Sequence, residues 1–95
     1  MDTEMKVNLN KEFSLSFEAN PTTGYRWEAI FDKDFLELKS GIYEPYSLEI
    51  IGGGGKEKFI FNPTKPGETT IIMRYKRAWE SNAFEEKTIK IIIAK

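Results

Sequence analysis

The chain contains neither cysteine nor histidine, and this is the most restrictive feature of its 95 residues. Without cysteine, no disulfide can stabilise the fold. Without histidine, the Ser–His and Cys–His pairs of nucleophilic catalysis are excluded, and so is a zinc site of the usual ligands. Only carboxylates, Lys, Tyr, Ser and Thr remain for chemistry. The sequence therefore favours a protein that binds over one that catalyses, and it implies no cofactor.

The sequence also lacks an excess of charge of one sign and a long apolar run. The 14 basic and 15 acidic residues give a net charge of −1, which makes nucleic acid and anionic membranes poor partners. No apolar segment approaches the roughly 20 residues of a membrane-spanning helix. The N-terminal segment Met1–Glu4 is acidic where a signal peptide would be basic. The expected localisation is secreted or extracytoplasmic where a signal peptide has been removed, and cytoplasmic otherwise.

The hydrophobic content of 40% and the aromatic content of 14% are typical of a chain that folds around a core. At this length one core is expected, so we predict a single domain over residues 1–95. We also expect the domain to be a monomer.

Apolar and polar residues alternate in several short segments, which is the period of a half-buried strand. The alternation is clear over Phe13–Phe17, Tyr25–Phe31 and Ile89–Ile93. Further strands are expected at Met5–Leu9, Leu36–Tyr43, Phe59–Phe61 and Thr69–Tyr75. Seven predicted strands without a convincing helix indicate an antiparallel β-sandwich of the immunoglobulin type, with a small barrel as the alternative. Trp27 would be the central aromatic residue of the core.

Three of the six connections carry unusual sequences, and strands that alternate in direction would place these three at one end of the sandwich. They are the second, fourth and sixth connections, at Asn20–Gly24, Glu44–Gly55 and Arg77–Glu85. The other connections are plain polar turns at Asn10, Asp32–Asp34 and Asn62–Gly67, with Gly67 expected at positive φ. Loops on a rigid sandwich commonly carry binding sites.

The second connection reads as a short, rigid tip. Pro21 fixes its own φ and biases Asn20 toward an extended conformation. Thr22 and Thr23 are β-branched and stiff at χ1. Gly24 supplies a position where φ can be positive. The segment therefore predicts a tip that presents two hydroxyls, although an ordinary turn remains an alternative.

The fourth connection contains Pro45, which is expected to break strand pairing, and a run of glycines. The run is Gly52, Gly53, Gly54 and Gly55. A phosphate-binding loop fits poorly, because Lys56 is followed by Glu57 and a strand instead of Ser or Thr and a helix. Two alternatives stay open: a flexible connector, and backbone that must lie close against a partner.

The sixth connection contains Arg77, Ala78 and Trp79, with Phe84 further on. Tryptophan and arginine are the residue types enriched in binding hot spots. The alternative is that Trp79 folds back over the end of the sandwich and packs there.

Together these three motifs resemble those of the chagasin-type inhibitors of cysteine peptidases. The resemblance rests on Asn20–Tyr25, the glycines of the fourth connection and Arg77–Trp79. Their order and spacing match over nearly the whole chain, from Phe13 to Ile93. The third motif departs from the family, which usually has proline where this chain has Ala78.

The resemblance implies a tight, reversible, non-covalent inhibitor of papain-like, cathepsin-like cysteine peptidases. It implies that Thr22 and Thr23 lie closest to the peptidase nucleophile and its histidine. The glycine loop would run along the non-primed side of the cleft, and Arg77 and Trp79 would hold the primed side. The implied peptidase-binding residues are Asn20, Pro21, Thr22, Thr23, Gly24, Tyr25, Gly52, Gly53, Gly54, Gly55, Arg77, Ala78 and Trp79.

Two other classes of function stay open. An immunoglobulin-like adhesion or assembly module would bind through a sheet edge, or bind carbohydrate through aromatic residues. An enzyme could use Asp32, Asp34 and Glu37, which would also suggest calcium. Their spacing lacks the glycine and glutamate positions of an EF-hand, so a solvated turn is the better interpretation.

Overall fold

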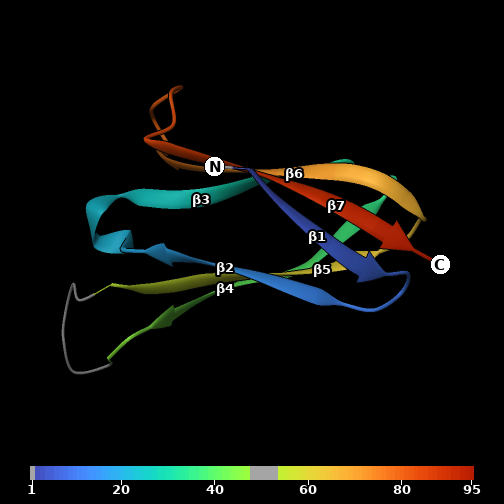
Figure 1. The fold of residues 1–95 in the computed structure, drawn as a ribbon. Coiled ribbons are helices and arrows are strands. Elements are labelled where there is room, and N and C mark those ends of the chain that lie inside the picture. The colour runs from blue at the N-terminus through green and yellow to red at the C-terminus, as the bar shows by residue number, and fades with distance from the viewer. Residues whose placement is uncertain (1, 48–53) are drawn as a thin grey trace.

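The computed structural model describes residues 2–47 and 54–95, which form two facing β-sheets (Figure 1). One sheet has the strand order β1-β7-β6-β3 and the other β2-β5-β4. The elements are β1 (Asp2–Asn8), β2 (Phe13–Ala19), the 3-10 turn η1 (Pro21–Thr23), β3 (Tyr25–Ile30), β4 (Leu36–Pro45), β5 (Gly55–Pro63), β6 (Gly67–Arg77) and β7 (Glu85–Ala94). The predicted seven-stranded sandwich is confirmed. In the described part of the chain, no helix has the length and apolar character needed to cross a membrane.

The first strand differs from its prediction in position and length. It begins at Asp2 instead of Met5 and ends at Asn8. It is the edge strand of its sheet and runs parallel to β7, from the pair Asp2–Thr88 to the pair Asn8–Ala94. The bounds of β1 are set by its pairing with a distant strand, and the local alternation of residues carries no information about that pairing.

The core lies between the sheets and contains the inward-facing residues predicted from the alternation. Trp27 is 7% exposed, and its ring lies 4.8 Å from that of Phe17 and 4.8 Å from that of Tyr75. The buried apolar residues are Val7, Leu15, Phe17, Ala19, Trp27, Leu36, Phe59, Phe61, Ile71, Met73, Ile89, Ile91 and Ile93. The prediction that Trp27 is a central core aromatic is confirmed.

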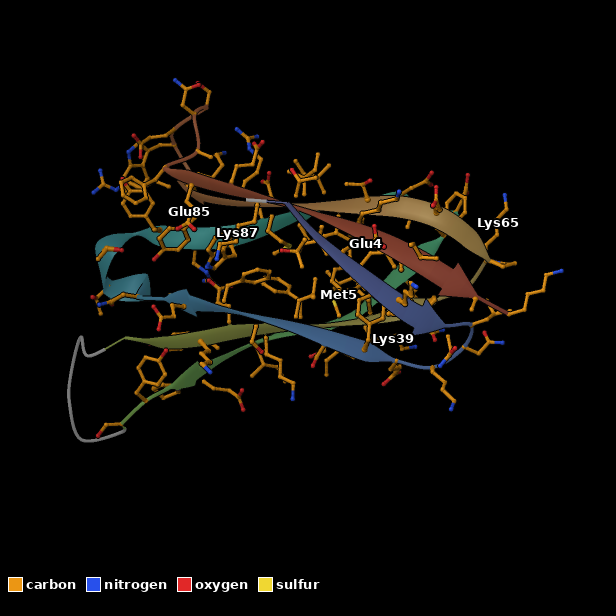
Figure 2. All side chains as sticks on the ribbon, viewed as in Figure 1. Glu4, Met5, Lys39, Lys65, Glu85 and Lys87 are labelled. Atoms are coloured by element: carbon orange, nitrogen blue, oxygen red, sulfur yellow. The ribbon has the colours of Figure 1, made fainter. Side chains whose placement is uncertain are left out.

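Two charged residues occupy inward-facing positions near one end of the core. Lys87 of β7 points between the sheets (Figure 2), and its ammonium lies 5.5 Å from the Phe17 ring and 5.8 Å from the Trp27 ring. Glu57 of β5 is 5% exposed, and its Oε1 accepts the backbone N–H of Trp27 at 3.2 Å. Trp27 lies on the edge strand β3, so no neighbouring strand accepts its backbone N–H on that side. Glu57 accepts this hydrogen bond and thereby links the two sheets.

The fourth strand is longer than predicted. It continues through Pro45, which pairs with Gly55 of β5, so the expectation that Pro45 breaks pairing is wrong. The reason is that β4 is an edge strand, where proline is tolerated. A register shift between Leu38 and Ser40 also interrupts the ladder, and Leu38 is 40% exposed.

Candidate functional site

Two connections, and the end of β4 and the start of β5 that flank a third, lie at one end of the sandwich, the left end in Figure 1. The first loop (20–24) joins β2 to β3, the middle loop (46–54) joins β4 to β5, and the third loop (78–84) joins β6 to β7. In Figure 1, η1 lies between the ends of β6 and β7 on one side and the ends of β4 and β5 on the other. This is the arrangement that alternating strand directions predicted.

The first loop is a 3-10 turn that Asn20 holds together. The Asn20 carbonyl accepts the backbone N–H of Thr23 at 3.1 Å and the Thr23 hydroxyl at 2.7 Å. The Asn20 Oδ1 accepts the backbone N–H of Thr22 at 3.2 Å and the Thr22 hydroxyl at 2.5 Å. Gly24 follows at a φ of +86°, as predicted for a position that favours glycine. Both threonines are exposed on a tip whose shape is fixed from within.

The base of the first loop is attached to the core through Tyr75. The backbone N–H of Asn20 donates to the Tyr75 hydroxyl at 3.1 Å. The Tyr75 ring lies between two others, 5.2 Å from Tyr25 and 4.8 Å from Trp27. These rings form a continuous row from the loop into the core, so the loop and the core are positioned together.

The third loop is organised by Arg77. Its guanidinium lies 4.5 Å from the Tyr25 ring and 5.8 Å from the Trp79 ring. The Arg77 carbonyl accepts the backbone N–H of Glu80 at 3.1 Å, which closes the turn over Ala78. The Trp79 side chain is 74% exposed, so core packing does not account for it.

The first and third loops touch where the Trp79 ring passes over Gly24. A Cβ atom built at Gly24 would lie 3.2 Å from Cη2 of Trp79 and 3.9 Å from Cγ of Arg77. Gly24 is therefore constrained twice, by its positive φ and by the indole above it. The predicted residues of these two loops form one continuous surface.

The glycines of the fourth connection have different roles. Gly52 and Gly53 lie outside the described residues. Gly54 has a φ of +81°, and a Cβ there would lie 3.4 Å from the carbonyl of Ala19, beside Asn20 of the first loop. Gly55 is buried in β5, and a Cβ there would clash with the carbonyl of Glu44. Gly55 therefore has a reason to be glycine within this chain, and β5 begins where a phosphate-binding loop would require a helix.

Two exposed aromatic residues border the site outside the predicted set. Phe84 is 75% exposed and its ring lies 5.6 Å from that of Tyr25. Tyr46 is 57% exposed, and its hydroxyl donates to Oε1 of Glu18 at 3.2 Å. Desolvation and the nearby Glu18 carboxylate raise the pKa of the Tyr46 phenol above its ordinary value of 10.0. Both are aromatic residues within predicted connections, and this is the sequence signal that could have identified them.

A pocket of about 300 Å³ lies between the first and middle loops. Its lining includes Asn20, Tyr46, Gly54 and Tyr75. Asn20 of the first loop is part of this lining, so the hollow adjoins the base of that loop.

The carboxylates considered for catalysis or calcium lie elsewhere. Asp32 and Asp34 follow β3, at the end of the sandwich opposite the three loops. The Asp32 Oδ1 accepts the backbone N–H of Asp34 at 2.9 Å, and its carbonyl accepts the N–H groups of Phe35 and Leu36 at 3.1 Å each. Asp32 therefore shapes a turn, in agreement with the better interpretation of this segment.

Comparison with known proteins gives relatives from one group. The chain is 32% identical to amoebiasin-1 of Entamoeba histolytica over 83 residues, covering 86% of this chain and 79% of the relative. It is 28% identical to amoebiasin-2 of the same organism over 78 residues, covering 80% of this chain. The chain spans 63% of the length of amoebiasin-2.

Solved structures share the fold over almost the full chain. The cysteine protease inhibitor EhICP2 from Entamoeba histolytica has a TM-score of 0.81 at 22% identity, covering 98% of this chain and 85% of that one. PbICP-C, solved in complex with falcipain-2, has a TM-score of 0.75 at 16% identity, covering 98% and 88%. At these identities the likeness concerns the fold.

Residues 6–93 match the family described as "Chagasin family peptidase inhibitor I42". The match includes β2 to β6 and the three loops in full. This chain therefore belongs to the chagasin family of peptidase inhibitors.

Proposed function

We propose that this chain is a tight, reversible, non-covalent inhibitor of papain-like cysteine peptidases, the cathepsin-like enzymes included. The observation that carries the proposal is the internally braced tip at residues 20–24, placed at one end of a β-sandwich between the third loop and the ends of β4 and β5. Membership of a family of peptidase inhibitors supports it, and so does the description of EhICP2 as a cysteine protease inhibitor.

Inhibition follows from the shape of the tip. A peptidase cleaves a segment that lies extended across its nucleophile. The segment after Asn20 is a 3-10 turn in which the Asn20 side chain and carbonyl accept four hydrogen bonds from Thr22 and Thr23. The turn fills the cleft without presenting a scissile bond correctly. Because it is ordered before binding, little conformational entropy is lost in the complex.

The other loops extend the contact on either side of the tip. Arg77, Ala78 and Trp79 lie against the primed side of the cleft, and the glycine segment that includes Gly52 and Gly53 follows the non-primed side. Three loops of this size can bury a standard interface of about 1,600 Å². The exposed indole of Trp79 is the strongest candidate for a hot spot, because large exposed aromatic residues gain most from desolvation.

A titration tests the proposal. Increasing amounts of the pure chain are added to a panel of papain-like peptidases with a small fluorogenic substrate, and a serine peptidase is the control. We expect stoichiometric loss of cysteine-peptidase activity and an unaffected serine peptidase. Full activity of every papain-like peptidase in micromolar excess of the chain would overturn the proposal.

A further inference from the structure

Arg77 is the last residue of β6 and belongs to the face of that strand that points between the sheets. It shares this face with Met73 and Tyr75, at the two-residue spacing of a strand. Arg77 is paired with Tyr25 of β3, and its guanidinium lies 4.5 Å from the centre of the Tyr25 ring. The Tyr25 ring stacks on Tyr75, which lies 4.8 Å from Trp27 in the core. Arg77 therefore ends the row of rings that begins in the core.

The same side chain contacts the third loop and the first. Its guanidinium lies 5.8 Å from the centre of the Trp79 ring. A Cβ built at Gly24 would lie 3.9 Å from Cγ of Arg77 and 3.2 Å from Cη2 of Trp79, so the Arg77 stem and the indole meet at Gly24. Trp79 is 74% exposed and lies outside the core. Among the contacts of the described residues, those with Arg77 and Gly24 are therefore the ones that fix where the indole lies.

Part of the Arg77 guanidinium is already engaged within the chain. Its Nε atom is buried and has no hydrogen-bond partner in the described part of the chain, and Oε1 of Glu80 is 3.9 Å away. The Glu80 N–H donates to the Arg77 carbonyl at 3.1 Å, which closes the turn that carries Trp79. A planar guanidinium stacks on aromatic rings through its faces, which leaves its outer N–H groups as the atoms that a partner could reach. A direct contact of those N–H groups with the peptidase is therefore the competing explanation.

We infer that Arg77 is a positioning residue of the inhibitor: it places the Trp79 indole over Gly24, and its share in inhibition passes through that indole. This inference rests on the proposed function, in which the third loop lies against the primed side of the cleft. There the indole makes the contact, and Arg77 fixes the indole relative to the Tyr25 ring and the core. Because the stack holds the indole before binding, less side-chain freedom is lost in the complex.

The first test needs only the free chain. The ring current of an indole shifts the NMR signals of nearby protons, so the two α-protons of Gly24 report where Trp79 lies. In Arg77→Met, these signals should move toward their positions in Trp79→Ala, because the indole is no longer held. Lys76→Met removes a positive charge from the opposite face of the same strand, so it is the control and should leave the signals unchanged. Gly24 signals that stay the same in Arg77→Met would overturn the inference.

The second test is a double-mutant cycle on inhibition. Inhibition constants against a papain-like peptidase are measured for the unchanged chain, Arg77→Met, Trp79→Ala and the double variant. Arg77→Met should weaken inhibition about tenfold in the unchanged chain, within the range for residues in contact. In the Trp79→Ala background the same change should weaken it by less than about twofold, because the indole through which Arg77 acts is already absent. Arg77→Lys keeps the charge and loses the planar stack, and it takes the place of Arg77→Met in both tests if thermal unfolding shows that Arg77→Met does not fold.

The outcomes separate the two explanations. Equal losses of inhibition in the two backgrounds would mean that Arg77 contacts the peptidase itself, which overturns the inference and leaves the proposed function intact. A loss in Lys76→Met as large as that in Arg77→Met would assign the effect to net charge and would also overturn the inference. Absence of inhibition by the unchanged chain would overturn the proposed function, while the Gly24 signals would still show whether Arg77 places the indole.

Discussion

Gly24 is the residue at which the first and third loops are fitted together. A side chain at its φ of +86° is strained, and a Cβ there would lie 3.2 Å from Cη2 of Trp79, so the indole would have to shift. Gly24→Val should therefore weaken inhibition at least about tenfold, because strain of this kind costs about 1–3 kcal/mol and shifts both loops. The measurement is the inhibition constant against a papain-like peptidase, together with thermal unfolding.

Gly67 provides the matched control for this substitution. It has a φ of +133°, a built Cβ there would lie 3.1 Å from Phe35, and it lies at the opposite end of the sandwich. Gly67→Val should lose comparable stability and keep its inhibition constant. Equal losses of inhibition in the two variants would mean that general destabilisation, and not the fit of the loops, explains the effect of Gly24→Val.

Trp79 exposes an indole that lies outside the core and touches the fold only at Gly24 and Arg77 among the contacts of the described residues. With 74% of the residue exposed, Trp79→Ala should leave the thermal midpoint nearly unchanged. Inhibition should weaken by about 2 kcal/mol or more, roughly thirtyfold, if the indole is a hot spot. Ile30→Ala, at an exposed apolar residue at the far end of β3, is the control and should keep its inhibition constant. A Trp79→Ala variant that loses stability as much as inhibition would identify Trp79 as part of the packed structure.

At the scale of elements, the sequence predicts what local pattern determines and misses what distant pairing determines. The inward faces of β2, β3, β6 and β7 follow from alternation alone. The continuation of β4 through Pro45 depends on pairing with Gly55, and the start of β1 depends on pairing with Thr88. Glu57 faces inward and accepts the backbone N–H of Trp27, 30 residues away, and no local sequence pattern predicts this.

The junction of β4 and β5 gives a prediction at this scale. A Cβ at Gly55 would meet the carbonyl of Glu44 and lie 2.7 Å from Cα of Pro45, so the two backbones must separate to accept it. Gly55→Ala should lower the free energy of unfolding by about 2 kcal/mol or more. Gly41→Ala in the same pair of strands is the control, because its Cβ would only touch the Phe59 ring at 3.4 Å. Urea unfolding measures both, and equal stabilities would contradict the close approach seen here.

At the scale of the whole molecule, the local features of the site can be predicted from the sequence, and its long-range contacts cannot. The bonds that brace the tip join residues two or three positions apart, so Asn-Pro-Thr-Thr-Gly predicts a rigid turn by itself. The gathering at one end of the strand ends that carry the three connections follows from counting strands that alternate in direction. The hydrogen bond from Asn20 to Tyr75 joins residues that are 55 positions apart. Gly24 and Trp79, which are in contact, are also far apart in the sequence. Such contacts are set by the assembled sandwich, and the sequence does not reveal them.

The central claim is that a braced turn occupies a peptidase cleft and is not turned over as a substrate. The most direct measurement mixes equimolar chain and papain-like peptidase, and follows residual activity and the intact mass of the chain in the same sample over many hours. The account predicts that activity toward a small substrate is lost and that the chain keeps its full mass. Persistent activity, or cleavage of the chain between Asn20 and Gly24, would contradict it.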